Sequence, residues 1–338
     1  MRPEPFKKWT RKRRLRRRLR AYLPYAGKSS YRIVIAHRPL PPDLVEFRRD
    51  GRHLTLFLAP RETLLNDRAY YIYRVYLPVI LHVFSRTFES VTGAIAELND
   101  GTTVRSDHLL FCSPHPDALL LPDPEFYNSN AHEDVRQTLA NQRPWSERDD
   151  RLVWRGSTTG RAEFLGADLD LARPNLKQRI RMCGVLKSVP GVDARINQVV
   201  QSKDAERDEV RLRQVGIFGD TIARETWLDR KFALDIDGNT NAWTNFYIRL
   251  LYGCCVIKVG SPAGFRQWYY HRLEPWKHFV PARADLGDLA ERIQWCRDHP
   301  TECAEIAANG RALALSMTIE SETAYATGRI NARLGMKQ

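Results

Sequence analysis

The hydrophobic pattern is clearest at residues 231–262, where it predicts a strand, a turn, a helix and a second strand. Residues 231–236 are apolar enough for a buried strand, and the DGN turn at 237–239 interrupts them. Residues 241–252 carry apolar side chains at helical spacing, and the apolar run 254–259 follows. A strand–helix–strand unit of this kind predicts a parallel sheet with a right-handed crossover.

The rest of the chain alternates strand-like and helical segments on either side of a polar stretch at residues 140–150. Before this stretch we expect three strands, a helix that Pro78 should kink or interrupt, and a hairpin. These are strands 31–36, 54–58 and 108–112, helix 69–83, and hairpin strands 91–98 and 102–105 around the turn 99–101. After it, strands are expected at 152–154 and 194–200, and helices at 174–187, 218–229, 285–298 and 301–316.

The net charge of +13 is concentrated at the N-terminus. Residues 1–20 hold eleven Lys or Arg and one Glu, so the other 318 residues carry only +3. The basic tail, residues 1–28, has Leu15, Leu19 and Leu23 four residues apart, which suits an amphipathic helix on an anionic membrane surface or, alternatively, a disordered arm. The rest of the chain is nearly neutral and does not extend the basic surface of the tail, so we expect no nucleic-acid partner.

The six cysteines form no CxxC pair and mostly lie in apolar or helical segments, as expected for reduced core thiols of a cytosolic protein. No run approaches the ~20 apolar residues of a membrane span. The basic N-terminus also lacks the apolar region of a secretory signal. We therefore expect a cytoplasmic protein, peripheral on the inner membrane if the tail binds lipid.

The first candidate binding loop follows the strand at 152–154. It contains two glycines, three hydroxyls and two arginines, all suited to a phosphate: Arg155, Gly156, Ser157, Thr158, Thr159, Gly160 and Arg161. It lacks the GK[ST] of a P-loop and the GxGxxG of a dinucleotide fold, so a plain polar turn is the alternative. The DGNTN loop at 237–241 would open on the same sheet edge, where a ligand phosphate meets a helix start.

Asp235 and Asp237 form a DxD pattern, a spacing that holds a divalent cation in some sugar-nucleotide enzymes. The alternative is that one carboxylate binds backbone N–H groups of the turn. The aromatic-rich segment 265–279 suits stacking on a sugar or base, but packing explains most of its rings. Arg266, His271 and His278 are the members that packing explains least.

A proline-rich loop at 113–127 follows the last strand of the first domain and can present a general base. Its candidates are His115, Asp117, Asp123 and Glu125. The alternative for Asp123 and Glu125 is that they only cap or hydrate the turn.

Taken together, these segments resemble the CAP10-like glycosyltransferases of glycosyltransferase family 90, which include the eukaryotic protein O-glucosyltransferases. The matching pieces span about residues 105–320 in the family's order and spacing. They are WRGSTTGR (154–161), residues 231–259, 267–289 and 304–314, and PDPEFY (122–127). The form DGNTNAW is similar to the bacterial branch, whose members take part in lipopolysaccharide or capsule synthesis.

The resemblance implies an α/β protein of GT-B fold, with two Rossmann-like domains facing across a cleft. The basic tail would be followed by an N-terminal acceptor domain at 29–145 and a nucleotide-sugar-binding domain at 146–338. It also implies a UDP-sugar donor of the glucose or xylose class, inversion at the anomeric carbon, and no essential metal or other cofactor. The DxD pattern then belongs to the turn and the donor.

The sequence departs from the eukaryotic members in two places. Their Arg-Asp-Tyr-Pro-like stretch, whose Asp is the proposed base, reads CSPHPDA here, so Asp117 and His115 are the catalytic candidates. Their basic residue after the DG-like turn is replaced by Asn245. The expected donor-binding residues are therefore Arg155, Gly156, Ser157, Thr158, Thr159, Arg161, Asp237, Gly238, Asn239, Trp243, Asn245, Arg249 and Arg266.

We accordingly expect an inverting glycosyltransferase that moves a sugar from a UDP-sugar to a hydroxyl of lipopolysaccharide, capsule or another glycan. Arg side chains and loop N–H groups would stabilise the departing UDP. Because the base is not assigned, the alternative is a non-catalytic nucleotide- or carbohydrate-binding protein on the same fold.

Overall fold

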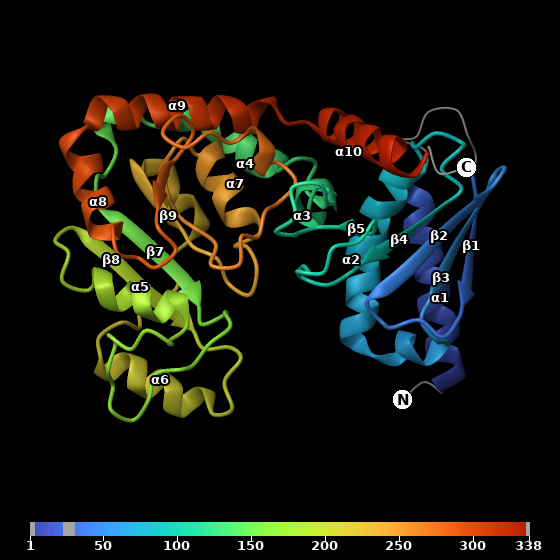
Figure 1. Ribbon diagram of the computed structural model, residues 1–338, viewed down its shortest axis with the longest axis horizontal. Coiled ribbons are helices and arrows are strands. Elements are labelled where there is room, and N and C mark those ends of the chain that lie inside the picture. The colour runs from blue at the N-terminus through green and yellow to red at the C-terminus, as the bar shows by residue number, and fades with distance from the viewer. Residues whose placement is uncertain (1–3, 23–30, 336–338) are drawn as a thin grey trace. The chain divides into compact units, whose positions relative to one another are not determined.

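The computed structural model describes residues 4–22 and 31–335, which form two compact units, each with its own sheet (Figure 1). Unit 1 comprises Met1–Ala131, Arg266–Tyr269 and Thr318–Gln338, and unit 2 comprises His132–Phe265 and Tyr270–Met317. The predicted domains met at residue 145. The compact units instead change at residue 131, and the C-terminal helix belongs to unit 1.

Unit 1 contains a six-stranded mixed sheet in the order β1-β3-β2-β4-β5-β6. The strands are β1 (Arg32–His37), β2 (Leu44–Asp50), β3 (His53–Leu58), β4 (Gly93–Glu97), β5 (Leu109–Leu110) and β6 (Leu119–Leu120). β2 is antiparallel to both of its neighbours, whereas all other pairs are parallel. The strands predicted at 31–36, 54–58 and 108–112 are confirmed, but β2 and β6 were not predicted.

The predicted hairpin at residues 91–105 is wrong. Its first strand is β4, which pairs with β2 and β5, while residues 102–105 form no strand. Local side-chain bonds hold this segment as a loop instead. Asn99 accepts the Gly101 N–H at 3.0 Å, and Thr102 accepts the Val104 N–H at 3.0 Å. Such bonds give the backbone an alternative to a ladder.

The helices of unit 1 are α1 (Glu4–Tyr22), α2 (Asp67–Phe84), α3 (Pro124–Asn128) and α10 (Ile319–Leu334). α2 runs through Pro78 without a break, so the predicted interruption does not occur. A proline cannot donate to the carbonyl four residues earlier, which is that of Arg74. That carbonyl accepts a hydrogen bond from Arg18 Nε of α1 at 2.9 Å instead.

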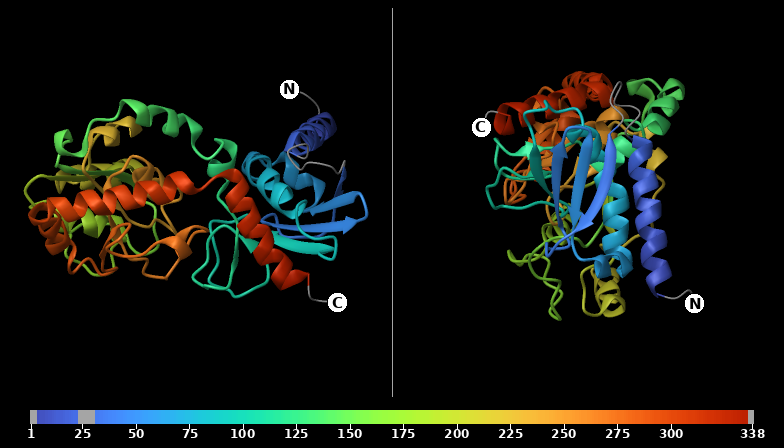
Figure 2. Two further views of the ribbon diagram at one scale, coloured as in Figure 1. Left: turned by 90° about the horizontal axis from the view of Figure 1, so that it is seen from above. Right: turned by 90° about the vertical axis from the view of Figure 1, so that its right-hand side faces the viewer.

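The described part of the basic tail, α1, is not a separate arm, because it packs against α2, the 3₁₀ turn Arg61–Leu65 and β1. Figure 2 shows α1 running beside α2. Leu15 and Leu19 are fully buried there, so the predicted apolar stripe serves the fold and does not face a membrane. Leu23 lies outside the described residues. Among the described helices none is long and apolar enough to cross a bilayer.

Unit 2 contains a five-stranded parallel sheet in the order β11-β10-β9-β7-β8. The strands are β7 (Leu152–Ser157), β8 (Val192–Gln198), β9 (Phe232–Asp235), β10 (Cys255–Val259) and β11 (Val280–Ala282). The helices are α4 (Glu133–Thr138), α5 (Gln178–Leu186), α6 (Ala205–Gln214), α7 (Thr244–Leu251), α8 (Leu289–Asp298) and α9 (Pro300–Ser316). The predicted β9–α7–β10 unit and its parallel pairing are confirmed.

One helix of unit 2 was misplaced. The segment 218–229 contains only the 3₁₀ turn Arg224–Asp229, whereas α6 forms at a stretch for which no helix was predicted. Leu212 is the only apolar side chain of α6 that is fully buried, so its hydrophobic pattern is weak. The Asp204 cap on Arg207 N and the Glu209–Arg213 ion pair hold the helix instead.

Candidate functional site

The two candidate loops meet in unit 2, at the carboxyl ends of β7 and β9. The Gly160 N–H donates to Asn239 Oδ1 at 3.2 Å. At Gly238 the approach is closer still, since a Cβ there would lie only 2.7 Å from Thr159 Oγ1. The sequence-based expectation that both loops share one sheet edge is therefore confirmed. In parallel sheets this edge is where ligands bind.

Arg179 of α5, which sequence reasoning missed, ties the two loops together. Its guanidinium donates to Asp237 O at 2.9 Å and to Ile236 O at 3.2 Å. It also donates to Ser157 O at 3.2 Å and to Thr159 Oγ1 at 2.7 Å. The side chain is buried, which lowers its pKa. Arg179 thus holds the two loops at a fixed distance from each other.

A sequence signal for Arg179 exists. It shares a helical face with Cys183 and Leu186, which are both buried. An arginine at that position of an apolar stripe must find buried acceptors. Lys177, just before the helix, acts in a similar way, because its Nζ donates to Thr158 O at 2.9 Å.

Lys258 of β10 occupies the space between the two carboxylates of the DxD pattern. Its Nζ lies 2.7 Å from Asp235 Oδ2 and 2.9 Å from Asp237 Oδ1, and all three side chains are buried. Burial alone would lower the pKa of Lys258, but the attraction of the two carboxylates outweighs it and raises that pKa. An ammonium therefore stands where a divalent cation would have to bind.

Asn245 belongs to the same buried network, since its Nδ2 donates to Asp235 Oδ1 at 2.7 Å. Two cations, Lys258 and Arg179, thus accompany two carboxylates beneath the loops, and the buried group is neutral by count. The side chain of Asp237, expected at the donor, is 3% exposed and serves this network.

Several other predicted donor residues have internal roles. Arg155 donates to Asp220 O, Trp154 O and Asp193 O, and it forms an ion pair with Asp193 Oδ2 at 2.7 Å. Its donors are therefore directed to the edge strand β8 and away from a phosphate, which departs from the prediction. Thr158 is buried and exchanges hydrogen bonds with the Val200 backbone at 2.8 Å.

Arg249 is buried on α7, with its guanidinium 3.6 Å from the centre of the Trp227 ring. Burial lowers its pKa to about 10. This packing does not fit the predicted contact with a donor phosphate. Trp243 stands at the start of the same helix with a φ of 49°, a strained value for a bulky residue.

Arg161 differs from these cations, because it is exposed at the end of the first loop. Among the described residues it has neither an ion pair nor a hydrogen-bond acceptor. Gly156, Ser157, Thr159, Gly160, Gly238 and Asn239 complete the two loops around it. Arg266 lies elsewhere, in unit 1, where its backbone pairs with Ser113.

Comparison with known proteins identifies the chain. The model of Glycosyl transferase family 90 matches residues 127–327, which is more than half of the sequence. The chain belongs to glycosyl transferase family 90. Both candidate loops and all of α5, α7 and β10 lie inside the matched region.

Relatives of this family 90 chain include the human Protein O-glucosyltransferase 3, 28% identical over 157 residues, which are 46% of this chain and 28% of that protein. Protein O-glucosyltransferase 2 of Danio rerio is 33% identical over 101 residues, covering 29% and 20%. Protein 179R of Invertebrate iridescent virus 6, itself uncharacterized, is 29% identical over 180 residues, covering 48% and 15%. The chain therefore spans less than a third of each of these relatives.

Among solved structures, Anabaena HepE in complex with UDP and glucose matches 60% of this chain and 52% of its own, at 13% identity and a TM-score of 0.34. Sucrose-phosphate synthase from Thermosynechococcus elongatus matches 94% and 92%, at 11% identity and a TM-score of 0.42. Likenesses of this strength carry no argument about function.

The predicted catalytic residues of the family 90 chain lie on the proline loop of unit 1. Asp117 accepts a hydrogen bond from Arg105 at 2.5 Å, and Arg333 lies 3.8 Å away. The bond from Arg105 lowers the pKa of Asp117, which makes it a weaker base. His115 directs Nε2 to the Thr103 carbonyl at 2.8 Å, so Nε2 carries the proton and Nδ1 is the ring's proton acceptor.

Asp123 and the aromatic segment follow the simpler alternatives. Asp123 is buried and caps α3 by accepting the Phe126 N–H at 2.8 Å. Burial raises its pKa to about 6. Trp268 and Tyr269 are buried in unit 1, where Trp268 packs on Phe126 at 4.7 Å between ring centres.

Three of the six cysteines cluster in the core of unit 2. The Sγ atoms of Cys255, Cys296 and Cys303 lie within 4.8 Å of one another. Hydrogen bonds from the other two thiols lower the pKa of Cys303. Thiols are ligands for soft metals, but these side chains lie among Leu, Ile and Val of the core. All six cysteines are free and buried, as predicted.

Proposed function

We propose that this family 90 chain binds a UDP-sugar at the two loops of unit 2 and transfers its sugar, with inversion, to an acceptor hydroxyl. The observation that carries the proposal is the clamp by Arg179, which holds both polar loops together at the carboxyl ends of β7 and β9. Membership of glycosyl transferase family 90 supports the reaction class, and the two loops are the proposed donor site.

The charge balance beneath the loops indicates how the diphosphate is bound. Because Lys258 and Arg179 are matched by Asp235 and Asp237, the buried group adds no net charge. Arg161 is a cation at the rim of this site that has no carboxylate partner among the described residues, and a guanidinium binds phosphate oxygens in a bidentate manner. We therefore propose that Arg161 stabilises the negative charge that develops on UDP as the sugar leaves.

The finer features of the proposal follow from the family resemblance. They are a donor of the glucose or xylose class, a lipopolysaccharide, capsule or other glycan acceptor, no metal requirement, a GT-B arrangement, and a cytoplasmic enzyme peripheral to the inner membrane. In this proposal His115 accepts the proton of the attacking hydroxyl at Nδ1. His115 suits that role better than Asp117, whose carboxylate is already bound by Arg105.

Calorimetric titration with UDP checks the donor site. Arg161→Gln should weaken UDP binding about tenfold, which corresponds to the loss of one charge-assisted contact. The matched control is Arg207→Gln, because Arg207 is also exposed in unit 2 but lies on α6. Absence of UDP binding by the wild type, or equal weakening by both variants, would contradict the assignment.

A non-catalytic binding protein is the second candidate, and the pairing of Asp117 with two arginines favours it. Turnover separates the two functions. A panel of UDP-sugars with a lipopolysaccharide acceptor should release UDP, and His115→Gln should abolish release while leaving UDP affinity unchanged. Binding of UDP without release by the wild type would favour the second candidate.

A further inference from the structure

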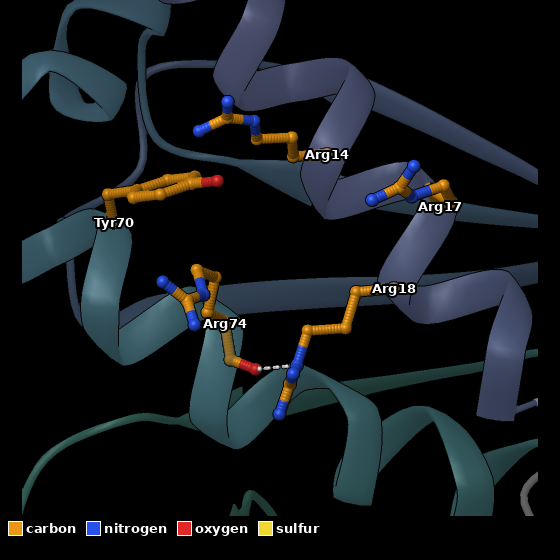
Figure 3. Close-up of a pocket in the computed structure, with 5 residues that line it drawn as sticks. All are labelled: Arg14, Arg17, Arg18, Tyr70 and Arg74. Carbon is orange, nitrogen blue, oxygen red and sulfur yellow. Dashed lines mark hydrogen bonds between the residues drawn. The ribbon is translucent and has the colours of Figure 1, made fainter.

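We propose that a pocket between α1 and α2 binds a phosphorylated group. The pocket has a volume of about 450 Å³ and is lined by Arg14, Arg17, Arg18, Tyr70 and Arg74 (Figure 3). Four guanidinium groups and one phenol therefore surround a space of the size that small ligands occupy. It lies entirely within unit 1, and none of its residues takes part in the proposed donor site.

Three of the four arginines in this pocket have no carboxylate partner among the described residues. Arg14, Arg17 and Arg74 are exposed, and no carboxylate among the described residues pairs with them. Arg11, one turn earlier on α1, does have a carboxylate, that of Asp67. Like charges held this close repel one another. An anion bound among them removes that repulsion.

The position of the pocket is fixed by two buried leucines and by one of its own arginines, Arg18. Leu15 and Leu19 are buried against the body of unit 1. Arg18 Nε is held by the Arg74 carbonyl that Pro78 leaves without a helical donor. The spacing i, i+3 and i+4 then places the remaining α1 arginines of the pocket on one face. The site therefore exists before a ligand arrives.

The chemistry of the lining defines the ligand class. Guanidinium groups bind phosphate oxygens bidentately, and several of them together favour a phosphate monoester or a diphosphate over a single carboxylate. In Figure 3 the Tyr70 hydroxyl points between Arg14 and Arg74 into the same space. The phosphate belongs either to a soluble phosphorylated molecule or to an anionic phospholipid headgroup, which share this chemistry.

Titration with inorganic pyrophosphate in an Arg161→Gln background, which weakens the proposed donor site, tests the pocket. Arg14→Gln/Arg17→Gln should weaken binding at least tenfold. The control Arg13→Gln/Arg20→Gln removes the same charge from exposed positions of the same helix and should change the dissociation constant less than twofold. No binding by the wild type, or equal weakening by both double variants, would overturn the proposal.

Because the four substituted side chains are exposed or line an open pocket, the variants should fold, and circular dichroism checks this. A charge-preserving variant, Arg14→Lys/Arg17→Lys, adds a readout of geometry. It should still lose affinity, about threefold or more, since Lys cannot bind bidentately. If this variant bound pyrophosphate as tightly as the wild type, the binding would need only positive charge and not the arginine geometry, which would overturn the proposal.

The source of the phosphate is read from flotation with vesicles of phosphatidylcholine containing phosphatidylglycerol. A lipid headgroup predicts binding that the Arg14→Gln/Arg17→Gln variant loses and that pyrophosphate displaces. A soluble ligand predicts pyrophosphate binding without flotation, and both results support the pocket. Flotation that survives the double variant and pyrophosphate would instead assign lipid binding to another surface and contradict the proposal.

Discussion

The two basic centres of this protein use their cations in opposite ways. In unit 2, Arg179 and Lys258 are buried, and their N–H groups donate to carbonyls and carboxylates of the same chain. In unit 1, Arg14 and Arg17 are exposed and lack a carboxylate partner among the described residues. The comparison shows that a cation near a binding loop is not thereby a ligand contact. Its internal partners decide whether it builds the site or binds the substrate.

The largest effect is expected at Lys258. Lys258→Met leaves two buried carboxylates without a cation and should lower the free energy of unfolding by about 3–5 kcal/mol. The control Lys277→Met removes an exposed lysine paired with Glu274 and should cost under about 1 kcal/mol. Urea unfolding measures both. Equal effects would show that burial does not separate the two kinds of cation.

Asp123 is a buried carboxyl that has no cation at its side among the described residues, in contrast to Asp235. Burial raises its pKa from 3.8 to about 6, so the folded state binds more protons than the unfolded state between those values. The stability that this proton contributes is present below pH 4 and is lost as the pH rises through 6. Asp123→Asn should remove that loss, a difference of about 3 kcal/mol.

The measurement for Asp123 is the difference in unfolding free energy between wild type and variant at pH 4 and pH 7. The free energy of unfolding of the variant, relative to that of the wild type, should increase as the pH rises from 4 to 7. The N-cap remains available in the variant, because an Asn oxygen also accepts the Phe126 N–H. A constant difference across this range would mean that Asp123 does not titrate there.

Gly238→Ala tests the close approach of the two candidate loops. The new Cβ would lie 2.7 Å from Thr159 Oγ1 and 3.3 Å from the Arg179 guanidinium, so the Thr159 side chain or the loop that carries it must shift. We expect a loss of about 1–3 kcal/mol in stability and weaker UDP binding. In Gly328→Ala the Cβ meets nothing within 4 Å on helix α10, so a small gain is expected. If Gly238→Ala left the UDP affinity unchanged, the contact between the two loops would not be needed for UDP binding.

The smallest effect is expected at the pocket. Arg14→Gln/Arg17→Gln relieves repulsion between exposed charges and should raise the thermal stability slightly, by up to about 0.5 kcal/mol. Arg11→Gln, which breaks the pair with Asp67 and the bonds to the Leu64 and Leu65 carbonyls, should lower it. A stability loss in the first variant as large as in the second would indicate that the pocket arginines are structural.

The sequence predicted the β9–α7–β10 unit because apolar runs of different period follow one another with a clear turn between them. It failed at residues 102–105, where side-chain bonds to the backbone compete with strand pairing. It also recognised the stripe of Leu15 and Leu19 correctly but assigned it the wrong partner, since periodicity reveals an apolar face and not what covers it.

At the candidate site, the two loops were predicted from their glycines and hydroxyls, but the cations were not. Arg155 lies in a motif that suits phosphate binding, yet its N–H groups donate to β8 and to the Asp193 carboxylate. Arg179 and Lys258 lie in apolar segments that look like plain core. Motifs locate the backbone of a site, whereas the partners of long charged side chains depend on distant segments.

Pro78 helps to set the axial register of the basic helix α1, together with the buried Leu15 and Leu19. Seven arginines recur along α1, and a sequence so repetitive can slide along a neighbouring helix with little change in its own pattern. The missing N–H of Pro78 leaves one acceptor on the facing surface, the Arg74 carbonyl, and Arg18 is the arginine that reaches it. A residue that removes a hydrogen bond from one helix thereby contributes to the alignment of another.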